Sequence, residues 1–212
     1  MAWTCEAMPE VECYPLTVDR WRDLEQRFGP RGATGGCWCM YWRLPRAQFV
    51  AHKGEGTKQA FRHLVESGEI VGLLAYAEGQ PVGWCAIAPR ESYSVLQRSR
   101  ILKRIDAMPV WSVVCFFVSK DFRGKGLTPV LLRAAVDYAV QHGAWIIEGY
   151  PVAPKTPRIP AAFAWTGLAS ALRQAGFVEV LRRSETGPIM RYEVSPSFHS
   201  LPAGGGKSIV KP

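Results

Sequence analysis

The sequence has no long uninterrupted stretch of apolar residues. Nowhere in its 212 residues does an apolar run reach about 18 residues, the length that a membrane-spanning helix needs. The first residues, MAWTCEAMPEVECYPLTVD, contain acids and a proline where a secretory signal has a basic segment followed by an apolar core. We therefore expect a cytoplasmic protein with no membrane partner.

The sequence also lacks the regular cysteine spacing of a disulfide-stabilised protein. Of its six cysteines, Cys85 and Cys115 lie in apolar runs, where a thiol packs as a small hydrophobe. Cys37 and Cys39 form a Cys-x-Cys in the segment GGCWCMYW. A structural zinc site needs about four ligands, often as C-x₂-C pairs, and no second pair with matching spacing is present. We predict no metal, and we keep a cysteine-based metal or redox protein as an alternative.

Acidic residues are fewer than basic ones, which gives a net charge of +8. Such a surface attracts polyanions, but no nucleic-acid-binding motif accompanies the charge, so we do not expect nucleic acid as the partner. The densest basic stretch, QRSRILKR at residues 97–104, has apolar residues between its charges. This pattern predicts a solvated helix face.

The order of the expected elements indicates the fold class. Residues 70–89 read as a hairpin, and Val110–Ser119 is apolar on both faces, as in a central strand. Helix-like and strand-like segments alternate irregularly, so an α+β or mixed α/β sheet fits better than a repeated βαβ unit. We predict a single domain over residues 1–195 and a flexible tail over 196–212.

The segment VSKDFRGKGLTPVLL is the most informative motif. A strand ends at Ser119, a turn with two glycines follows, and a helix opens at Leu127 or Thr128. The first N–H groups of a helix point outward together and favour an anion. The spacing fits neither a P-loop nor a dinucleotide fingerprint. The motif therefore indicates a phosphate or pyrophosphate site, and a plain strand–helix turn is the alternative.

This strand, turn and helix resemble the acyl-CoA-binding motif of the GNAT superfamily of N-acetyltransferases. The order of elements from the hairpin to QAGFVEVLRR is similar to the core of that family, and CWCMYWR is similar to a segment of one of its bacterial branches. The resemblance covers residues 10–195, most strongly from Val110 to Arg183. It implies a central mixed, mostly antiparallel sheet of about six to seven strands with helices on both faces.

The resemblance implies that acetyl-CoA, the acyl donor, lies between the strands at Val110 and Ala144. Backbone groups of the first strand would bind the pantetheine arm, at Phe116, Phe117 and Val118. Backbone N–H groups of the turn would bind the pyrophosphate, at Arg123, Gly124, Lys125, Gly126, Leu127 and Thr128. A backbone N–H of the Phe116–Val118 strand would also stabilise the oxyanion.

The sequence departs from the family pattern at two places. Thr128 stands where the family usually has Gly or Ala, and its hydroxyl could itself reach a phosphate. Many members carry a tyrosine on the late helix as the general acid, whereas the corresponding positions here are Ala171 and Leu172. The proton of the departing thiol must then come from elsewhere.

The acceptor side is expected at the aromatic segment, which the resemblance places in the acceptor wall. Its substrate-binding candidates are Trp38, Cys39, Tyr41 and Trp42. Aromatic rings there favour a cationic or a flat apolar acceptor. Aminoglycosides, amino-acid-like antibiotics, polyamines and protein lysines all remain open, and a homodimer is compatible with these features.

Two residues are candidates for catalysis. Attack on a thioester needs a neutral amine, so a base must remove a proton. Glu148 is the only acid on the strand predicted beside the cofactor, and Tyr150 shares its strand face. The alternatives are that Glu148 pairs with an arginine or faces solvent, and that Tyr150 forms a hydrogen bond within the wall.

The sequence thus supports an acetyl-CoA-dependent N-acetyltransferase acting on a primary amine. A GNAT-like module that binds CoA without catalysis is the main alternative, because the late-helix tyrosine is missing.

Overall fold

The computed structural model describes residues 9–156, 159–195 and 208–210. The strands are β1 (Val11–Pro15), β2 (Leu73–Ala77), β3 (Gln80–Pro89), β4 (Trp111–Val118), β5 (Ile146–Gly149), β6 (Val178–Ser184), β7 (Gly187–Glu193) and β8 (Ser208–Val210). The helices are α1 (Trp21–Phe28), α2 (Arg46–His52), α3 (Glu55–Glu66), α4 (Ser94–Arg98), α5 (Leu127–Gln141) and α6 (Ala169–Gln174). Short helical turns are η1 (Val18–Arg20), η3 (Arg90–Ser92), η4 (Lys120–Phe122) and η5 (Ala161–Phe163), and η2 (Gly32–Gly36) is an irregular turn with non-helical backbone angles at Ala33, Thr34 and Gly35.

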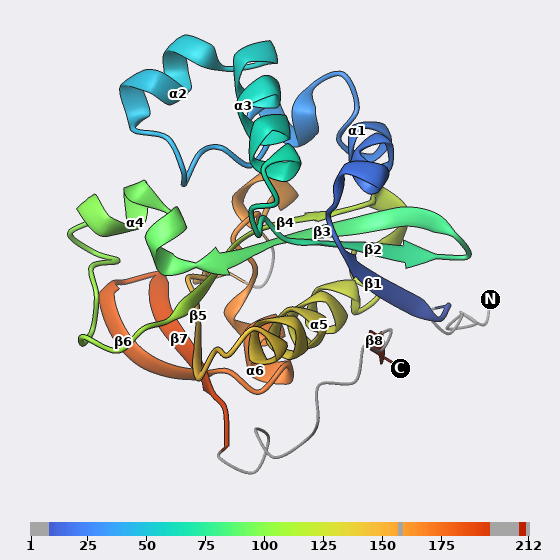
Figure 1. Cartoon of the computed structure of the whole chain (residues 1–212). Helices are drawn as coiled ribbons and strands as arrows, with labels where there is room; N and C mark the ends of the chain where they lie inside the picture. Colours follow the sequence, from blue (N-terminus) through green and yellow to red (C-terminus); the bar gives the residue numbers. More distant parts are fainter. Residues whose placement is uncertain (1–8, 157–158, 196–207, 211–212) are drawn as a thin grey trace.

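The strands of the described residues form one sheet in the order β6-β7-β5-β4-β3-β2-β1-β8. Among the described strands, β4 and β5 pair in parallel and the other neighbouring strands are antiparallel. Helices α1 to α4 lie over one face and α5 and α6 over the other (Figure 1). The predicted mixed, mostly antiparallel sheet with helices on both faces is therefore confirmed. The tail predicted to be flexible lies outside the described residues, except for β8.

Each face of the sheet has its own apolar core. On the α5 face, Leu131 and Leu132 are fully buried against the sheet, and on the other face Leu24 and Phe61 are fully buried. Burying one such side chain contributes about 1.5–3 kcal/mol. Among the described helices, none is both long enough and apolar enough to cross a membrane.

The parallel pair β4–β5 opens after three residues. Trp111 to Val113 pair with Ile147 to Gly149, but β4 continues to Val118. Pro151 follows shortly after β5 and has no N–H to donate, which ends the ladder. On its other edge β4 has a bulge at Val114, because Cys115 and Val113 pair with consecutive residues of β3. Because the two strands separate, the second half of β4 has no pairing with β5 along this edge.

The basic helix predicted at residues 97–104 is wrong beyond Arg98, where α4 ends. Two arginine side chains donate to carbonyl groups of this segment. Arg90 donates to the carbonyl groups of Leu96 and Leu102, and Arg183 donates to that of Lys103 at 2.8 Å. Side-chain donors therefore hold the irregular segment that follows α4.

Candidate functional site

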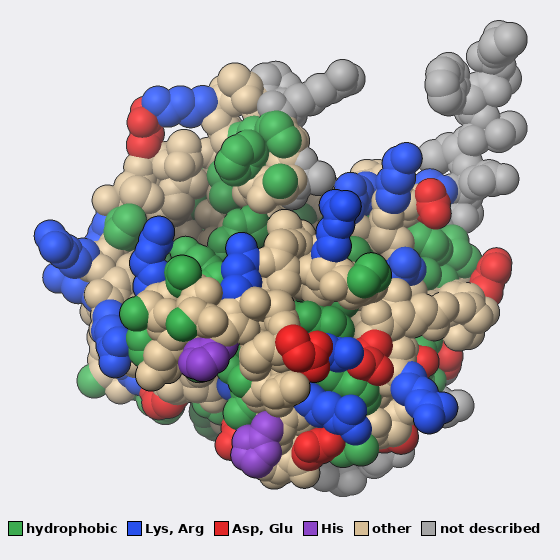
Figure 2. All heavy atoms as spheres, turned by 90° about the horizontal axis from the view of Figure 1, so that it is seen from above, with side chains coloured by type: hydrophobic (Ala, Val, Ile, Leu, Met, Phe, Trp, Pro, Cys, Tyr) green, Lys and Arg blue, Asp and Glu red, His purple; other side chains and the backbone are tan. Residues whose placement is uncertain are grey.

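One large cleft opens where β4 and β5 separate. Its volume is about 1150 Å³, and its walls come from the end of β4, the turn before α5, the β5–α6 loop and the segment between α1 and α3. Seen from above, the molecule is hollowed, with hydrophobic side chains in the hollow and Lys and Arg side chains around it (Figure 2). The cleft is large enough for an extended ligand.

The cleft brings together two predicted site segments that are distant in sequence. Of the predicted cofactor residues, its lining contains Phe116, Phe117, Val118, Arg123, Gly124, Gly126, Leu127 and Thr128. Of the predicted acceptor residues, its lining contains Cys39 and Tyr41. The predicted site residues that are absent from the described lining are Lys125, Trp38, Trp42, Glu148 and Tyr150.

The turn before α5 has the geometry of an anion-binding helix start. Gly126 precedes the helix with φ 89° and ψ 8°, a left-handed conformation that favours glycine. The N–H groups of Leu127 and Thr128 lie in the first turn, where the helix offers them no carbonyl. Arg123 and Lys125 are exposed and add positive charge. Arg123 Nε donates to the carbonyl of Val118 at 3.1 Å, which ties the turn to the end of β4.

The β5–α6 loop covers part of the open β4 edge. The N–H of Phe116 donates to the carbonyl of Trp165 at 2.7 Å. Phe116 is one of the positions at which the sequence predicts a bond to the acyl donor. That bond requires the Trp165 carbonyl to move away first.

Aromatic side chains from three segments meet at the cleft. The ring of Tyr41, which is 40% exposed, lies edge-on to Trp165 at 5.2 Å and to Phe49 at 5.5 Å between centroids. Trp42 contacts Trp165 at 5.6 Å, but its indole N–H donates to the carbonyl of Val114 at 3.0 Å. Trp42 is therefore buried as a support for the β4 bulge, and Tyr41 presents its ring to the cleft.

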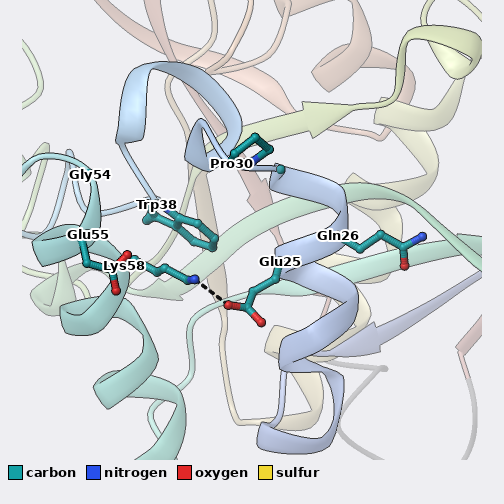
Figure 3. A pocket seen from close by; sticks show the side chains of 8 residues that line it. Glu25, Gln26, Pro30, Trp38, Gly54, Glu55 and Lys58 are labelled. Atoms are coloured by element: carbon teal, nitrogen blue, oxygen red, sulfur yellow. Dashed lines mark ion pairs between the residues drawn. The ribbon is translucent and has the colours of Figure 1, made fainter.

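Trp38 lies in the core and borders a separate hollow (Figure 3). It packs against Trp21 and Phe28, with ring centroids 5.9 and 5.6 Å away, and only 4% of it is exposed. The ammonium of Lys58 lies 5.3 Å from the Trp38 ring centroid and pairs with Glu25 at 2.7 Å. The cation beside Trp38 is thus a lysine of the chain itself, so Trp38 is not positioned as the acceptor-binding ring expected from the sequence.

Three thiols, those of Cys37, Cys39 and Cys115, line the cleft. Cys39 Sγ lies 4.0 Å from Cys115 Sγ and accepts the indole N–H of Trp84 at 3.0 Å. The hydrogen bond with Cys115, together with burial, raises the pKa of the Cys39 thiol well above its usual value. The hydrogen bond with Cys39, followed by burial, raises the pKa of the Cys37 thiol. Within the part of the chain that the structure describes, no three His, Cys, Asp or Glu side chains are grouped so that they could hold a metal ion.

We predict that Cys39 reacts slowly with alkylating agents, because the thiolate is the nucleophile and burial disfavours it. With iodoacetamide at pH 8, Cys39 of the native protein should be modified roughly tenfold more slowly than in the urea-denatured chain, or slower still. Peptide mass spectrometry follows the site directly, and the denatured chain is the control. Equal rates in both states would contradict the burial of this thiol.

Glu148 and Tyr150 lie in a buried polar network under η3. Arg191 donates to Glu148 Oε1 from Nε at 3.0 Å and from Nη2 at 2.9 Å. Arg90 Nη1 lies 3.4 Å from Oε2, and the Tyr150 hydroxyl donates to the same oxygen at 2.7 Å. Glu148 is 1% exposed. Burial, followed by the charge of Glu148, raises the pKa of the Tyr150 hydroxyl.

This network corresponds to the arginine-paired alternative considered for Glu148. Its carboxylate is engaged by two guanidinium groups and one hydroxyl, and the described cleft lining does not include it. Tyr150 also lies 2.9 Å from Ser112 Oγ, so its hydroxyl is engaged within the wall. The geometry gives both residues structural partners and places neither in the described cleft lining.

Sequence reasoning did not select Phe49, Lys53 or Trp165, all of which line the cleft. Phe49 lies in α2 and Lys53 directly follows that helix, and no sequence motif indicates either residue. Trp165 follows a proline-rich loop, in the sequence FAWTG. An aromatic residue in such a loop was the one local signal.

Comparisons with known proteins identify the fold. The family model described as "Acetyltransferase (GNAT) family" matches residues 38–153 of the chain. Comparison with curated protein sequences finds no match.

Three solved structures illustrate the likeness. A GNAT-family acetyltransferase from Listeria monocytogenes is 12% identical, with a TM-score of 0.53 over 88% of this chain and 96% of that one. The aminoglycoside acetyltransferase AAC(6')-Ib, in complex with paromomycin and acetyl-CoA, is 17% identical, with a TM-score of 0.50 over 93% and 99%. A ribosomal-protein-S5-alanine acetyltransferase from Vibrio fischeri is 13% identical, with a TM-score of 0.50 over 88% and 94%. At these identities the likeness establishes a shared fold.

Proposed function

Because the chain belongs to the acetyltransferase (GNAT) family, we propose that it transfers an acetyl group from acetyl-CoA to a primary amine of a small molecule or a protein. The main support for this proposal is the cleft, because its lining includes both the anion-binding start of α5 and, on the expected acceptor side, Cys39 and Tyr41. A solved structure with this fold holds acetyl-CoA together with an antibiotic, which supports a site that takes both a donor and an acceptor.

The donor would be held by backbone groups. The N–H groups of Leu127 and Thr128 would bind the pyrophosphate, with Arg123 adding charge. The exposed β4 edge at Val118 would hold the pantetheine arm. The N–H of Phe116 would bind the thioester carbonyl once the Trp165 carbonyl has moved away, and would then stabilise the oxyanion as the amine nitrogen attacks the carbonyl carbon.

Proton transfer would rely on solvent. The described cleft lining contains no Asp, Glu or His, so the attacking amine would lose its proton to water. The late helix offers no hydroxyl at the usual place, because Leu172 is buried and Ala171 ends in a methyl group. As the carbon–sulfur bond breaks, the departing thiolate would take a proton from water. The absence of a carboxylate or an imidazole from the described lining favours the second candidate function, a CoA-binding module without catalysis.

Calorimetry and a thiol-release assay test both candidates. We expect acetyl-CoA and CoA to bind, and we expect a suitable amine to raise the release of CoA thiol above the rate in water. Binding of both ligands without release on any amine would support the module. Failure of both ligands to bind would contradict both candidates, and metal analysis of the purified protein would then test the cysteine-based alternative.

A further inference from the structure

The charges that line the cleft have one sign. Among the described lining residues, the charged side chains are those of Lys53 and Arg123. Arg123 belongs to the turn assigned to the donor pyrophosphate. Lys53 is therefore the other charged residue of the described lining.

Lys53 is held on the acceptor side by the loop that precedes the aromatic segment. It follows the last residue of α2, and the N–H of the next residue, Gly54, donates to the carbonyl of Gly36 at 3.1 Å. A Cβ added to Gly35 would stand 3.3 Å from Lys53 Nζ, so the ammonium lies against this loop. Lys53 is exposed, and none of the ion pairs among the described residues includes it. Its charge is available to a ligand.

Flat apolar surfaces accompany this charge. Tyr41, Phe49 and Trp165 all line the cleft, and their rings contact one another edge-on through Tyr41. Aromatic rings in this arrangement offer edges and faces to another flat ring. The hydrophobic hollow of this face is surrounded by Lys and Arg side chains (Figure 2).

We propose that the acceptor is an amine that carries an anionic group on a flat apolar body, with Lys53 binding the anion and the aromatic rim binding the flat part. This inference rests on the proposed acetyl transfer. A polycation such as a polyamine would meet no carboxylate in the described lining and would bring its charges next to Lys53, which costs free energy. Lys53 therefore favours an acceptor with an anionic group over the purely cationic acceptor that the aromatic segment alone suggested.

Four matched amines test the charge without changing the ring. 4-Aminobenzoate and 3-(aminomethyl)benzoate carry the carboxylate, and 4-aminobenzamide and 3-(aminomethyl)benzamide are their neutral counterparts; spermidine and kanamycin represent polycations. For each we would measure kcat/KM with acetyl-CoA and the Kd for the protein saturated with CoA. We expect each carboxylate to be favoured over its amide by about tenfold, in kcat/KM where turnover occurs and otherwise in Kd.

Variants at Lys53 show whether this residue is the cause. Lys53→Gln should abolish the preference, so that kcat/KM (or Kd) becomes about equal for each carboxylate and its amide. Lys53→Glu should reverse the preference. The Kd of acetyl-CoA should stay unchanged in both variants. Lys103→Gln is the matched control, since Lys103 is exposed and outside the cleft lining. Its preference should equal that of the parent protein.

The outcomes separate this inference from the proposed function. A polycation preferred over the carboxylates, no preference for carboxylate over amide in the parent protein, or a preference unaffected by Lys53→Gln would overturn the inference alone. If Lys53→Gln weakens acetyl-CoA binding and leaves the preference for carboxylate over amide unchanged, Lys53 binds the donor. That result would also overturn the inference. Failure of the parent protein to bind acetyl-CoA would overturn both.

Discussion

Replacing Glu148 with Gln is expected to lower the free energy of unfolding by about 3–5 kcal/mol, because it removes the only carboxylate bound by both Arg90 and Arg191 in the described structure. Arg191 keeps a second partner in Asp106, at 2.7 Å. Arg90 is fully buried and would keep only the Tyr150 hydroxyl and two carbonyl groups. A buried guanidinium without a counter-charge is the costly result. Urea unfolding followed by circular dichroism measures the loss.

Two further variants distinguish this structural role from catalysis. Glu185→Gln removes an exposed partner of Lys155, and a surface pair of this kind contributes about 0–1 kcal/mol. The double variant Arg90→Met with Glu148→Leu replaces two buried charges by apolar groups, and it should regain much of the lost stability. A Glu148→Gln protein that is as stable as the parent but has lost turnover would instead support Glu148 as the catalytic base.

The strand and turn residues of the predicted donor site lie in the cleft lining, whereas Glu148 does not, and this difference shows which features a local sequence pattern can predict. The apolar run at Val110–Ser119 and the two glycines of RGKG define a strand and a helix start through neighbouring residues alone. Both could therefore be predicted, and the cleft contains most of the residues assigned there. The order of hairpins and helices was also enough to predict a mixed sheet.

The partners of Glu148 could not be predicted because they come from distant segments. Arg90 follows β3 and Arg191 lies on β7, and only the pairing of β5 with β7 places Glu148 opposite Arg191. From the sequence alone, the single acid on a central strand was therefore a candidate base, and its arginine partners could not be foreseen. The same reason applies to Trp38 and Trp42, since the sequence shows how many rings are present but the fold decides which rings the core uses.

Trp165 illustrates the complementary case, in which a residue of the cleft carries no recognisable motif. Its carbonyl bonds to Phe116 because the β5–α6 loop returns across the open edge of β4. Loop geometry of this kind depends on the splay of two strands, which no local pattern encodes. The residues proposed to bind the donor through their backbone groups were thus easier to predict than the loop residues on the opposite side of the cleft.

Replacing Gly126 with Ala is expected to weaken acetyl-CoA binding by about 10- to 100-fold. Gly126 has φ 89° at the position before α5, and a side chain there costs about 1–3 kcal/mol of backbone strain. The turn can relieve the strain only by rotating, which moves the N–H groups of Leu127 and Thr128. Losing one such bond to a charged phosphate costs about 1.5–3 kcal/mol, and each 1.4 kcal/mol is a factor of ten in Kd.

Gly143 provides a matched control at the other end of the same helix. It has φ 81°, and a Cβ at either glycine would meet no atom within 4 Å. Gly143→Ala should therefore lower the free energy of unfolding as much as Gly126→Ala does, but it should leave the Kd of acetyl-CoA unchanged, because Gly143 is outside the cleft lining. Calorimetry gives the Kd and urea unfolding gives the stability. Equal losses of affinity in the two variants would mean that the turn does not bind the donor, because general destabilisation of α5 would then explain both.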